Sequence, residues 1–424
     1  MLIYLEKVRR KTLFSRFEPI VTEPLELLYI KSVLDSMGIE NGIIDPLFSL
    51  EASGGDLPDM VILTGYNVAE EEMKKRAHWW KNQNRDILVM VSGVHVQLNS
   101  GKFMEDYIDF IFHTQDFGVF KELLYRIQRE EEVHGLTGLH TRKGDGSWEL
   151  GEERPVQSPE AILPSRDLYK SNKDRTRYVD KKRLALVKGG RGCPYACSYC
   201  YCRSLNGGTF VRPDFSRMFE EMETIGADHY WIVDDVLLVD RKDAMEFIRA
   251  SRDVSFEGGI IAYLRADFIV REREFLKDLR DGGLSEVIIG FETPDREELL
   301  DYNKKVDVYI YEEAISLLKD NNIQLTALFM VHPDYGLGEF WRLWTFILKN
   351  RLDLYTISIF TPLPGSDEFL SYQDRLTTDK AESFDFLHLV LPSRLPRPVF
   401  YGLFYLSHLK LLFSKRILKY ILMR

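Results

Sequence analysis

The stretch Arg191-Gly192-Cys193-Pro194-Tyr195-Ala196-Cys197-Ser198-Tyr199-Cys200 decides how the rest of the chain is interpreted. It holds three of the four cysteines of this 424-residue chain in the spacing C-x3-C-x2-C, and Cys202 follows two residues later. Three thiolates on one tight loop can bind three irons of a [4Fe–4S] cluster, which leaves the fourth iron free for a substrate or cofactor. Ferredoxin-type carriers use four cysteines in other spacings, and structural zinc sites favour two C-x2-C pairs or a Cys/His set.

An aromatic residue, Tyr199, precedes the third cysteine, and with it the loop resembles the cysteine motif of the radical S-adenosylmethionine (SAM) superfamily. The resemblance implies that Cys193, Cys197 and Cys200 are the metal ligands and take part in catalysis. It also implies that the open iron chelates SAM, and that an electron from the cluster cleaves SAM to methionine and a 5′-deoxyadenosyl radical. The alternative is a zinc knuckle or a coincidental cysteine-rich loop.

Composition is that of a globular protein long enough for two or three domains, with 45% hydrophobic residues and a net charge of −10. The acidic balance argues against a nucleic-acid partner. The cysteines are too few and too clustered for a disulfide framework. The first 17 residues carry charges inside their only apolar run, and no stretch reaches the roughly 20 apolar residues of a membrane span, so we expect a cytoplasmic protein.

Residues 1–130 alternate strand and helix patterns, which predicts an α/β domain with a Rossmann-like, doubly wound parallel sheet. Continuous apolar runs at 58–66 and 87–95 predict two buried strands. Ligands of such sheets bind beyond the carboxyl ends of the strands. The candidate cofactor contacts are therefore the residues that end these two strands, namely Thr64, Gly65, Tyr66, Ser92, Gly93 and His95.

This layout resembles the cobalamin-binding (B12) domain that is fused to many radical SAM enzymes, and the resemblance implies bound cobalamin. Residues 24–29 look like the early helix of that domain, and Ser92-Gly93-Val94-His95 looks like its Gly-Gly-x-His turn. The Asp-x-His-x-x-Gly motif of other cobalamin proteins is absent, and residues 114–117 replace the usual Gly-Glu-Gly-Glu turn. The alternative is a domain that has lost cobalamin and only shapes a cavity. For His95 there is a separate alternative, a hydrogen-bonded loop histidine in place of a cofactor contact.

Residues 131–182 predict a linker with a hairpin around Gly144-Asp145-Gly146. Residues 183–365 repeat strand and helix six times, which predicts a partial (β/α)6 TIM barrel with its chemistry at the carboxyl ends of the strands. The strands are expected near residues 184–190, 229–235, 258–265, 286–291, 324–331 and 354–361. The cysteine loop follows the first of them.

Other strand ends carry polar residues that resemble landmarks of the superfamily and are candidate cofactor contacts. Glu292, after the fourth strand, can accept hydrogen bonds from the ammonium or ribose of SAM. Arg265, after the third strand, can hold a carboxylate by two-point contact. Tyr199 can stack on adenine. Asp234, after the second strand, completes the set, although a charged residue at a strand end is often only a solvated cap.

Residues 366–424 predict a small helical segment that caps the barrel, and seven Lys or Arg but no Asp or Glu occur from Arg394 onward. Two interpretations of residues 399–423 stay open. The segment could be a helix on a membrane surface, or a helix that closes the open side of the barrel with its basic face outward. The second interpretation is favoured.

Taken together, these features predict a cobalamin-dependent radical SAM methyltransferase that methylates an unactivated carbon through a 5′-deoxyadenosyl radical and methylcobalamin. The resemblance implies a small-molecule or peptide substrate and an external electron donor such as flavodoxin or ferredoxin. One alternative is a non-methylating rearrangement, cyclisation or atom swap on the same scaffold, because a fold does not determine a reaction. A more remote alternative is a structural-metal binding module without catalysis.

Overall fold

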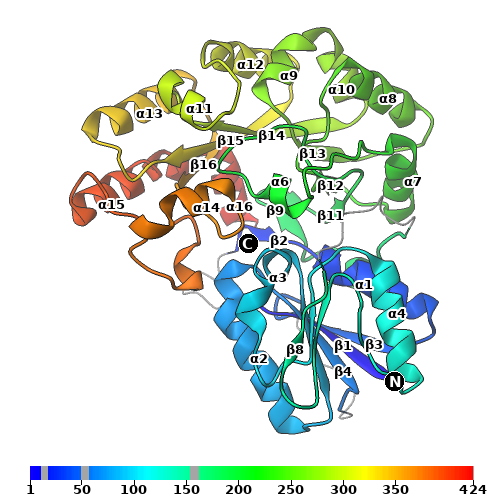
Figure 1. Cartoon of the computed structure of the whole chain (residues 1–424). Coiled ribbons are helices and arrows are strands. Elements are labelled where there is room, and N and C mark those ends of the chain that lie inside the picture. Colours follow the sequence, from blue (N-terminus) through cyan, green and yellow to red (C-terminus); the bar gives the residue numbers. More distant parts are fainter. Residues whose placement is uncertain (11–17, 49–56, 153–161, 424) are drawn as a thin grey trace. The chain divides into compact units, whose positions relative to one another are not determined.

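The computed structural model describes residues 1–10, 18–48, 57–152 and 162–423 and divides the chain into two compact α/β units (Figure 1). The first unit contains Met1–Phe17, Glu23–Asn172 and Lys380–Asp385. The second unit contains Glu18–Thr22, Lys173–Asp379 and Phe386–Arg424.

A seven-stranded sheet in the order β3-β1-β4-β5-β6-β7-β8 forms the first unit. The first five strands in this order are parallel, and β7 and β8 add an antiparallel hairpin at one edge. The strands are β1 (Leu2–Lys7), β3 (Glu40–Ile44), β4 (Met60–Thr64), β5 (Leu88–Ser92), β6 (Phe110–Phe112), β7 (Leu139–Arg142) and β8 (Trp148–Glu149). The helices are α1 (Leu25–Ser36), α2 (Glu70–Gln83), α3 (Val94–Leu98), α4 (Phe117–Gln128) and α5 (Asp167–Asn172).

Helices cover both faces of this sheet, as the predicted doubly wound arrangement requires. Alternate residues of β1 point to opposite faces: Ile3 and Leu5 belong to the core under α1 and α4, whereas Tyr4 belongs to the core under α2. Both cores are closed by fully buried aliphatic side chains, which explains why the sequence shows continuous apolar runs in β4 and β5.

Six parallel strands in chain order, β11 to β16, form the sheet of the second unit and confirm the predicted partial barrel. The strands are β11 (Leu184–Val187), β12 (His229–Ile232), β13 (Gly259–Tyr263), β14 (Leu284–Glu292), β15 (Gln324–Val331) and β16 (Leu354–Ile359). Figure 1 shows the helices on the outer side of this sheet. They are α7 (Phe215–Ile225), α8 (Arg241–Arg252), α9 (Ala266–Arg271), α10 (Leu276–Asp281), α11 (Arg296–Asp301), α12 (Tyr309–Asp320) and α13 (Leu337–Lys349).

The stretch expected as a linker, 131–182, contributes to both units. Its hairpin, β7 and β8, extends the sheet of the first unit because β7 pairs with β6. Its last part forms β9 (Arg177–Tyr178) and β10 (Lys181–Lys182), which join β2 (Ile20–Val21) in a small sheet of the second unit. Residues 153–161 of the expected linker lie outside the described residues.

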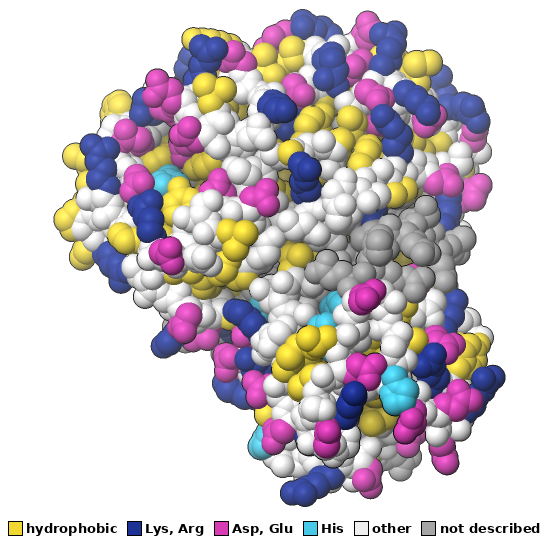
Figure 2. Space-filling view, in the orientation of Figure 1, with side chains coloured by type: hydrophobic (Ala, Val, Ile, Leu, Met, Phe, Trp, Pro, Cys, Tyr) yellow, Lys and Arg dark blue, Asp and Glu magenta, His cyan; other side chains and the backbone are white. Residues whose placement is uncertain are grey.

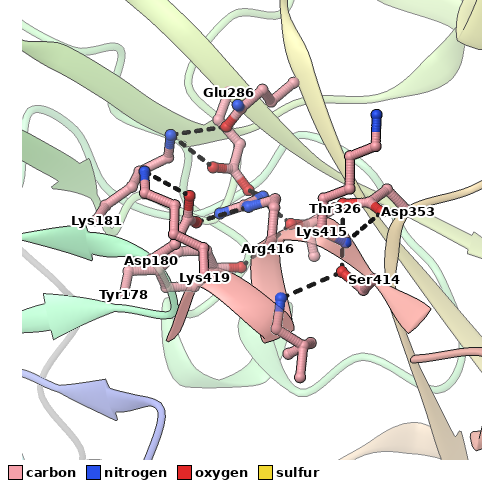
Figure 3. Close-up of polar contacts among 12 residues, drawn as sticks. Tyr178, Asp180, Lys181, Glu286, Thr326, Asp353, Ser414, Lys415, Arg416 and Lys419 are labelled. Atoms are coloured by element: carbon pink, nitrogen blue, oxygen red, sulfur yellow. Dashed lines mark hydrogen bonds and ion pairs between the residues drawn. The ribbon is translucent and has the colours of Figure 1, made fainter. Parts of the chain in front are cut away.

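The C-terminal segment contains α14 (Asp367–Tyr372), α15 (Arg397–Leu406), the 3-10 helix η6 (Leu409–Phe413) and α16 (Lys415–Leu422). Lys415 and Lys419 of α16 are exposed, as the predicted outward basic face requires, but Arg416 departs from that prediction. Arg416 is buried at the amino ends of the barrel strands, whereas Leu418 and Leu422 are exposed (Figure 3). Among the helices in the described ranges, none is long and apolar enough to cross a membrane.

Candidate active site at the cysteine loop

The cysteine loop, residues 188–201, leaves the carboxyl end of β11 and is tied to a neighbouring strand-like segment. Arg191 and Val211 exchange two backbone hydrogen bonds of 3.0 and 2.8 Å. Gly192 has a φ of +75°, and a Cβ at this position would lie 2.1 Å from the carbonyl oxygen of Thr209. Only glycine fits this close backbone approach, so Gly192 sets the direction in which the loop leaves the strand.

A second set of contacts holds the middle of the loop against the segment that follows α11. The backbone N–H of Ser198 donates to the carbonyl of Tyr302 at 3.2 Å. The side-chain amide of Asn303 donates to the carbonyl of Ala196 at 2.7 Å. The loop is therefore anchored on both sides before any cofactor binds.

All four cysteines are free thiols and half-buried. Burial raises the pKa of Cys193 to about 11 and also raises the pKa of Cys197. A hydrogen bond from Cys202 lowers the pKa of Cys200, while Cys202 itself donates to a carboxylate oxygen of Asp235 at 3.1 Å. Among the described residues, no group of three or more His, Cys, Asp or Glu side chains lies close enough together to hold a single metal ion.

Tyr199 of the loop contacts Glu292, and both were expected from the sequence; Lys304 joins them. The Tyr199 hydroxyl donates to Oε1 of Glu292 at 3.0 Å, and Nζ of Lys304 donates to the same oxygen at 2.7 Å. Glu292 has a φ of +62° in a strand irregularity, and a Cβ at Gly290 would lie 2.2 Å from Oε1 of Glu292. Such backbone strain is retained where it aims a functional side chain.

Arg265 is held at the same end of the barrel by three contacts. Its Nε donates to Asp267 at 2.8 Å, and one terminal nitrogen donates to the carbonyl of Lys304 at 2.8 Å. The guanidinium carbon lies 3.8 Å from the ring centroid of Tyr195, which is a cation–π contact with the cysteine loop. The guanidinium is thus positioned next to the loop.

Asp234, which the sequence offered as a cofactor contact, supports the backbone of the loop. It is 2% exposed, and its two carboxylate oxygens accept hydrogen bonds from the amides of Gly189 at 2.9 Å and Gly190 at 2.6 Å. Burial raises its pKa to about 7 in spite of these bonds. The carboxylate is therefore committed to the start of the loop.

In the first unit, the expected contacts lie at the carboxyl ends of β4 and β5. Thr64 and Ser92 are paired in register at these ends. Gly65 has no room for a side chain, because a Cβ there would lie 2.7 Å from the sulfur of Met73. Gly93 has a φ of +106° and precedes α3. The two strand ends thus present small residues side by side.

His95, the sixth candidate of this group, is a buried hydrogen-bonded histidine. Its Nε2 lies 2.8 Å from a carboxylate oxygen of Glu70, and its ring packs edge-on against Phe103. His95 is therefore hydrogen-bonded, as the alternative expected, but it lies on a helix and not in a loop. The physical reason is that α3 begins at Val94 and brings the imidazole against the first residue of α2.

A buried ion pair that was not predicted from the sequence lies at the same edge of the sheet. Lys7, which is 3% exposed, pairs with Glu26 of α1. Its Nζ also lies 4.2 Å from the ring centroid of Tyr66, which is 57% exposed. Burial acts against the charged lysine, but the Glu26 carboxylate outweighs it and raises the pKa of Lys7. A lysine at the carboxyl end of the first strand was the only signal in the sequence.

Comparisons with known proteins agree with the geometry of the second unit. Residues 187–347 match the model of the radical SAM superfamily. Hopanoid C-3 methylase from Methylococcus capsulatus is 28% identical over 288 residues, which are 66% of this chain and 53% of that protein. The chain therefore spans about half the length of this relative.

Two solved structures share the fold of both units at low sequence identity. The cobalamin-dependent SAM radical enzyme OxsB superposes on 96% of this chain and 65% of its own, with a TM-score of 0.73 and 13% identity. The radical SAM methyltransferase TsrM from Kitasatospora setae superposes on 89% of this chain and 76% of its own, with a TM-score of 0.67 and 14% identity. The cysteine loop, the barrel and the match over residues 187–347 therefore agree in making this part of the chain similar to the radical SAM superfamily.

Proposed function

We propose that the chain is a cobalamin-dependent radical SAM methyltransferase acting on a carbon atom of a small-molecule or peptide substrate. The observation that carries the proposal is the position of Cys193, Cys197 and Cys200 on one anchored loop beside Tyr199 and Glu292. Likeness to OxsB and TsrM, whose solved structures contain cobalamin, supports a second cofactor in the first unit. The methylase among the relatives supports methyl transfer.

The thiols fit an iron–sulfur cluster by donor type and position. Soft thiolates are the ligands that such clusters use, and these three lie half-buried at the carboxyl end of β11, where barrel enzymes bind their reactants. Because Cys193 has a pKa of about 11 in the unloaded protein, binding must release a proton there. Cluster loading should accordingly be more favourable at mildly alkaline pH.

The polar groups next to the loop fit SAM. Glu292 would accept hydrogen bonds from the ammonium or ribose of SAM, with Lys304 and Tyr199 holding its carboxylate in place. Arg265 would offer its remaining guanidinium hydrogens to the carboxylate of SAM. Asp234 would act through the loop backbone.

Cobalamin would lie at the ends of β4 and β5, against Thr64, Tyr66 and the Ser92-Gly93 turn. Since Glu70 already holds the imidazole of His95, we do not assign His95 as a cobalt ligand. The small residues at these strand ends carry no bulky side chain that would keep a flat cofactor away from the backbone. The cofactor would therefore bind mainly by shape and by backbone contacts.

When bound, the cluster and SAM supply a 5′-deoxyadenosyl radical and cobalamin supplies the methyl group, after an external donor such as flavodoxin or ferredoxin delivers electrons. The part of the chain is to hold the reactants in position and to exclude water, which protects reactive species. The double anchoring of the cysteine loop serves that purpose, because it positions the thiols before the cofactors arrive.

Anaerobic reconstitution with iron, sulfide and hydroxocobalamin, followed by desalting and metal analysis, tests the proposal. We expect about four irons and about one cobalt per chain, since one cubane cluster and one cobalamin are proposed. Cys200→Ala should lose the iron, whereas the matched variant Cys202→Ala should keep it. Iron without cobalt would contradict the cobalamin assignment, and SAM cleavage without methylated product would favour a non-methylating radical reaction.

A further inference from the structure

The helix α16 buries an arginine and a tyrosine and exposes three aliphatic side chains. Arg416 and Tyr420 are buried, whereas Leu418, Ile421 and Leu422 are 46%, 58% and 86% exposed. A helix that packs on the core of a globular protein shows the opposite distribution. Something in the environment of the protein should therefore favour an apolar outer face.

Buried charges set the rotation of this helix about its axis. Arg416 donates to Asp180 at 2.7 Å and to Glu286 at 2.6 Å, and Thr326 also donates to Glu286 at 2.6 Å (Figure 3). Glu286 is fully buried, so turning α16 to bury its leucines would remove the arginine from this carboxylate and leave Lys181, at 3.5 Å, as its cationic partner. The apolar face is consequently held toward the outside.

Exposed apolar side chains also occur on η6, which contacts α16, and on α13. Phe413 of η6 is 80% exposed, and Trp341 of α13 is 66% exposed. A groove of about 380 Å³ between α13 and α15 is lined by Trp344, Leu348 and Leu406, among others. Figure 2 shows hydrophobic side chains at the left edge of the molecule, over α13 and α15. The C-terminal apolar surface, as we name it, comprises Trp341, Leu348, Leu412, Phe413, Leu418, Ile421 and Leu422.

Positive charge borders this surface in an otherwise acidic protein. Residues 394–424 carry seven Lys or Arg and no Asp or Glu, so with a net charge of −10 for the whole chain the rest carries −17. Lys415 and Lys419 are both exposed on α16 itself. Apolar and aromatic side chains flanked by lysines on an exposed helix are typical of helices that lie in a membrane interface. The sign of the charge selects an anionic surface.

We propose that the C-terminal apolar surface docks on a bilayer that contains anionic lipids, with α16 lying in the plane of the headgroups. Phe413, Leu418, Ile421 and Leu422 enter the boundary of the acyl chains, and the lysines of α16 remain at the level of the phosphates. The buried Arg416 network keeps the apolar face turned toward the bilayer. This inference does not depend on the reaction proposed above.

Vesicle flotation of the full chain tests the proposal, with phosphatidylcholine vesicles and with vesicles of mixed phosphatidylcholine and phosphatidylglycerol. We expect the protein to float with the mixed vesicles and more weakly with phosphatidylcholine alone. The double variant Leu418→Glu/Ile421→Glu should weaken binding about tenfold or more, because two anchors become anionic. Leu300→Glu, at a site on α11 that is 70% exposed, is the matched control and should bind like the parent chain.

Three results would overturn the proposal. The first is absence of flotation with the mixed vesicles. The second is an equal loss of binding in Leu300→Glu, which would mean that any added negative charge is enough. The third is a lipid-free dimer, seen by light scattering, that Leu418→Glu/Ile421→Glu dissociates, because the surface would then be covered by a second copy of the chain. Circular dichroism of each variant verifies that it is folded.

Discussion

Lys304 organises the polar residues beside the cysteine loop. It is 7% exposed, its ammonium lies 2.7 Å from Glu292 and 3.3 Å from the Tyr199 hydroxyl, and its carbonyl accepts a hydrogen bond from Arg265. A lysine with most of its surface removed from water is retained where its charge has a partner. Its partner here is the carboxylate of Glu292, the side chain that we propose to bind SAM.

Replacing this cation should therefore weaken SAM binding. We expect Lys304→Gln to raise the dissociation constant of SAM about tenfold, because Glu292 loses the charge-assisted hydrogen bond that orients it. Equilibrium dialysis with the cluster-loaded protein measures this. The neighbouring exposed residue gives the control variant Lys305→Gln, which should bind SAM normally. If the two variants bound SAM with equal affinity, Lys304 would have no role in SAM binding.

At the scale of elements, the neighbouring strands β6 and β7 of the first unit bring together a pair of histidines, one directly after β6 and one in β7. The rings of His113 and His140 lie 4.1 Å apart, and both residues are buried. Within the described residues, Nε2 of His113 has no hydrogen-bond partner. Burial, and then the neighbouring His140, lowers the pKa of His113 to about 4.

This pair should make the protein sensitive to mild acid. The unfolded chain takes up the His113 proton near pH 6.5 and the folded chain only near pH 4, so stability is lost as the pH falls between these values. Thermal unfolding can be measured at about pH 7 and about pH 5. Between these pH values the melting temperature of His113→Phe should fall less than that of the parent chain. His134→Gln, at an exposed histidine of the same unit, should behave like the parent. An unchanged loss in His113→Phe would show that other groups cause the acid sensitivity.

The helix α16 stabilises the second unit through one buried arginine. Burial alone would raise the pKa of Asp180, but Arg416 outweighs it and lowers that pKa. Arg416→Met leaves Asp180 and Glu286 without their shared cation, and removing one partner of a buried ion pair costs about 3–5 kcal/mol. Urea unfolding should report a loss of this size.

The control for this prediction contacts the same carboxylate from the surface. Lys419 lies 3.3 Å from Asp180 but is 60% exposed. Exposed ion pairs contribute about 0–1 kcal/mol, so Lys419→Met should change the free energy of unfolding by no more than that. If Arg416→Met lowered the free energy of unfolding no more than Lys419→Met, the ion pairs of Arg416 would be too accessible to water to set the rotation of α16 about its axis.

For the whole molecule, the two proposed metal sites lie in separate compact units. The cysteine loop is part of the second unit, and the ends of β4 and β5 are part of the first. The triple variant Cys193→Ala/Cys197→Ala/Cys200→Ala should therefore lose its iron and keep its cobalt after reconstitution. Metal analysis with Cys202→Ala as control measures both. Loss of cobalt together with iron would contradict independent binding.

Much of the architecture can be predicted from the sequence because it depends on local patterns. Continuous apolar runs predict the parallel strands, and the six-fold strand–helix repeat predicts the partial barrel, since buried strands need apolar side chains on both faces. The C-x3-C-x2-C spacing identifies the cysteine loop because its ligands are close neighbours in the chain.

Only the tertiary structure decided what individual polar residues do. The sequence suggested Asp234 as a cofactor contact, whereas in the structure it accepts hydrogen bonds from loop amides. His95 is hydrogen-bonded to Glu70. Lys304, from the segment after α11, pairs with Glu292. The rotation of α16 likewise follows from Arg416 and its distant partners. The physical reason is the same in each case. A charged side chain is placed by partners far away in sequence, and no local pattern records which partner is nearest once the chain is folded.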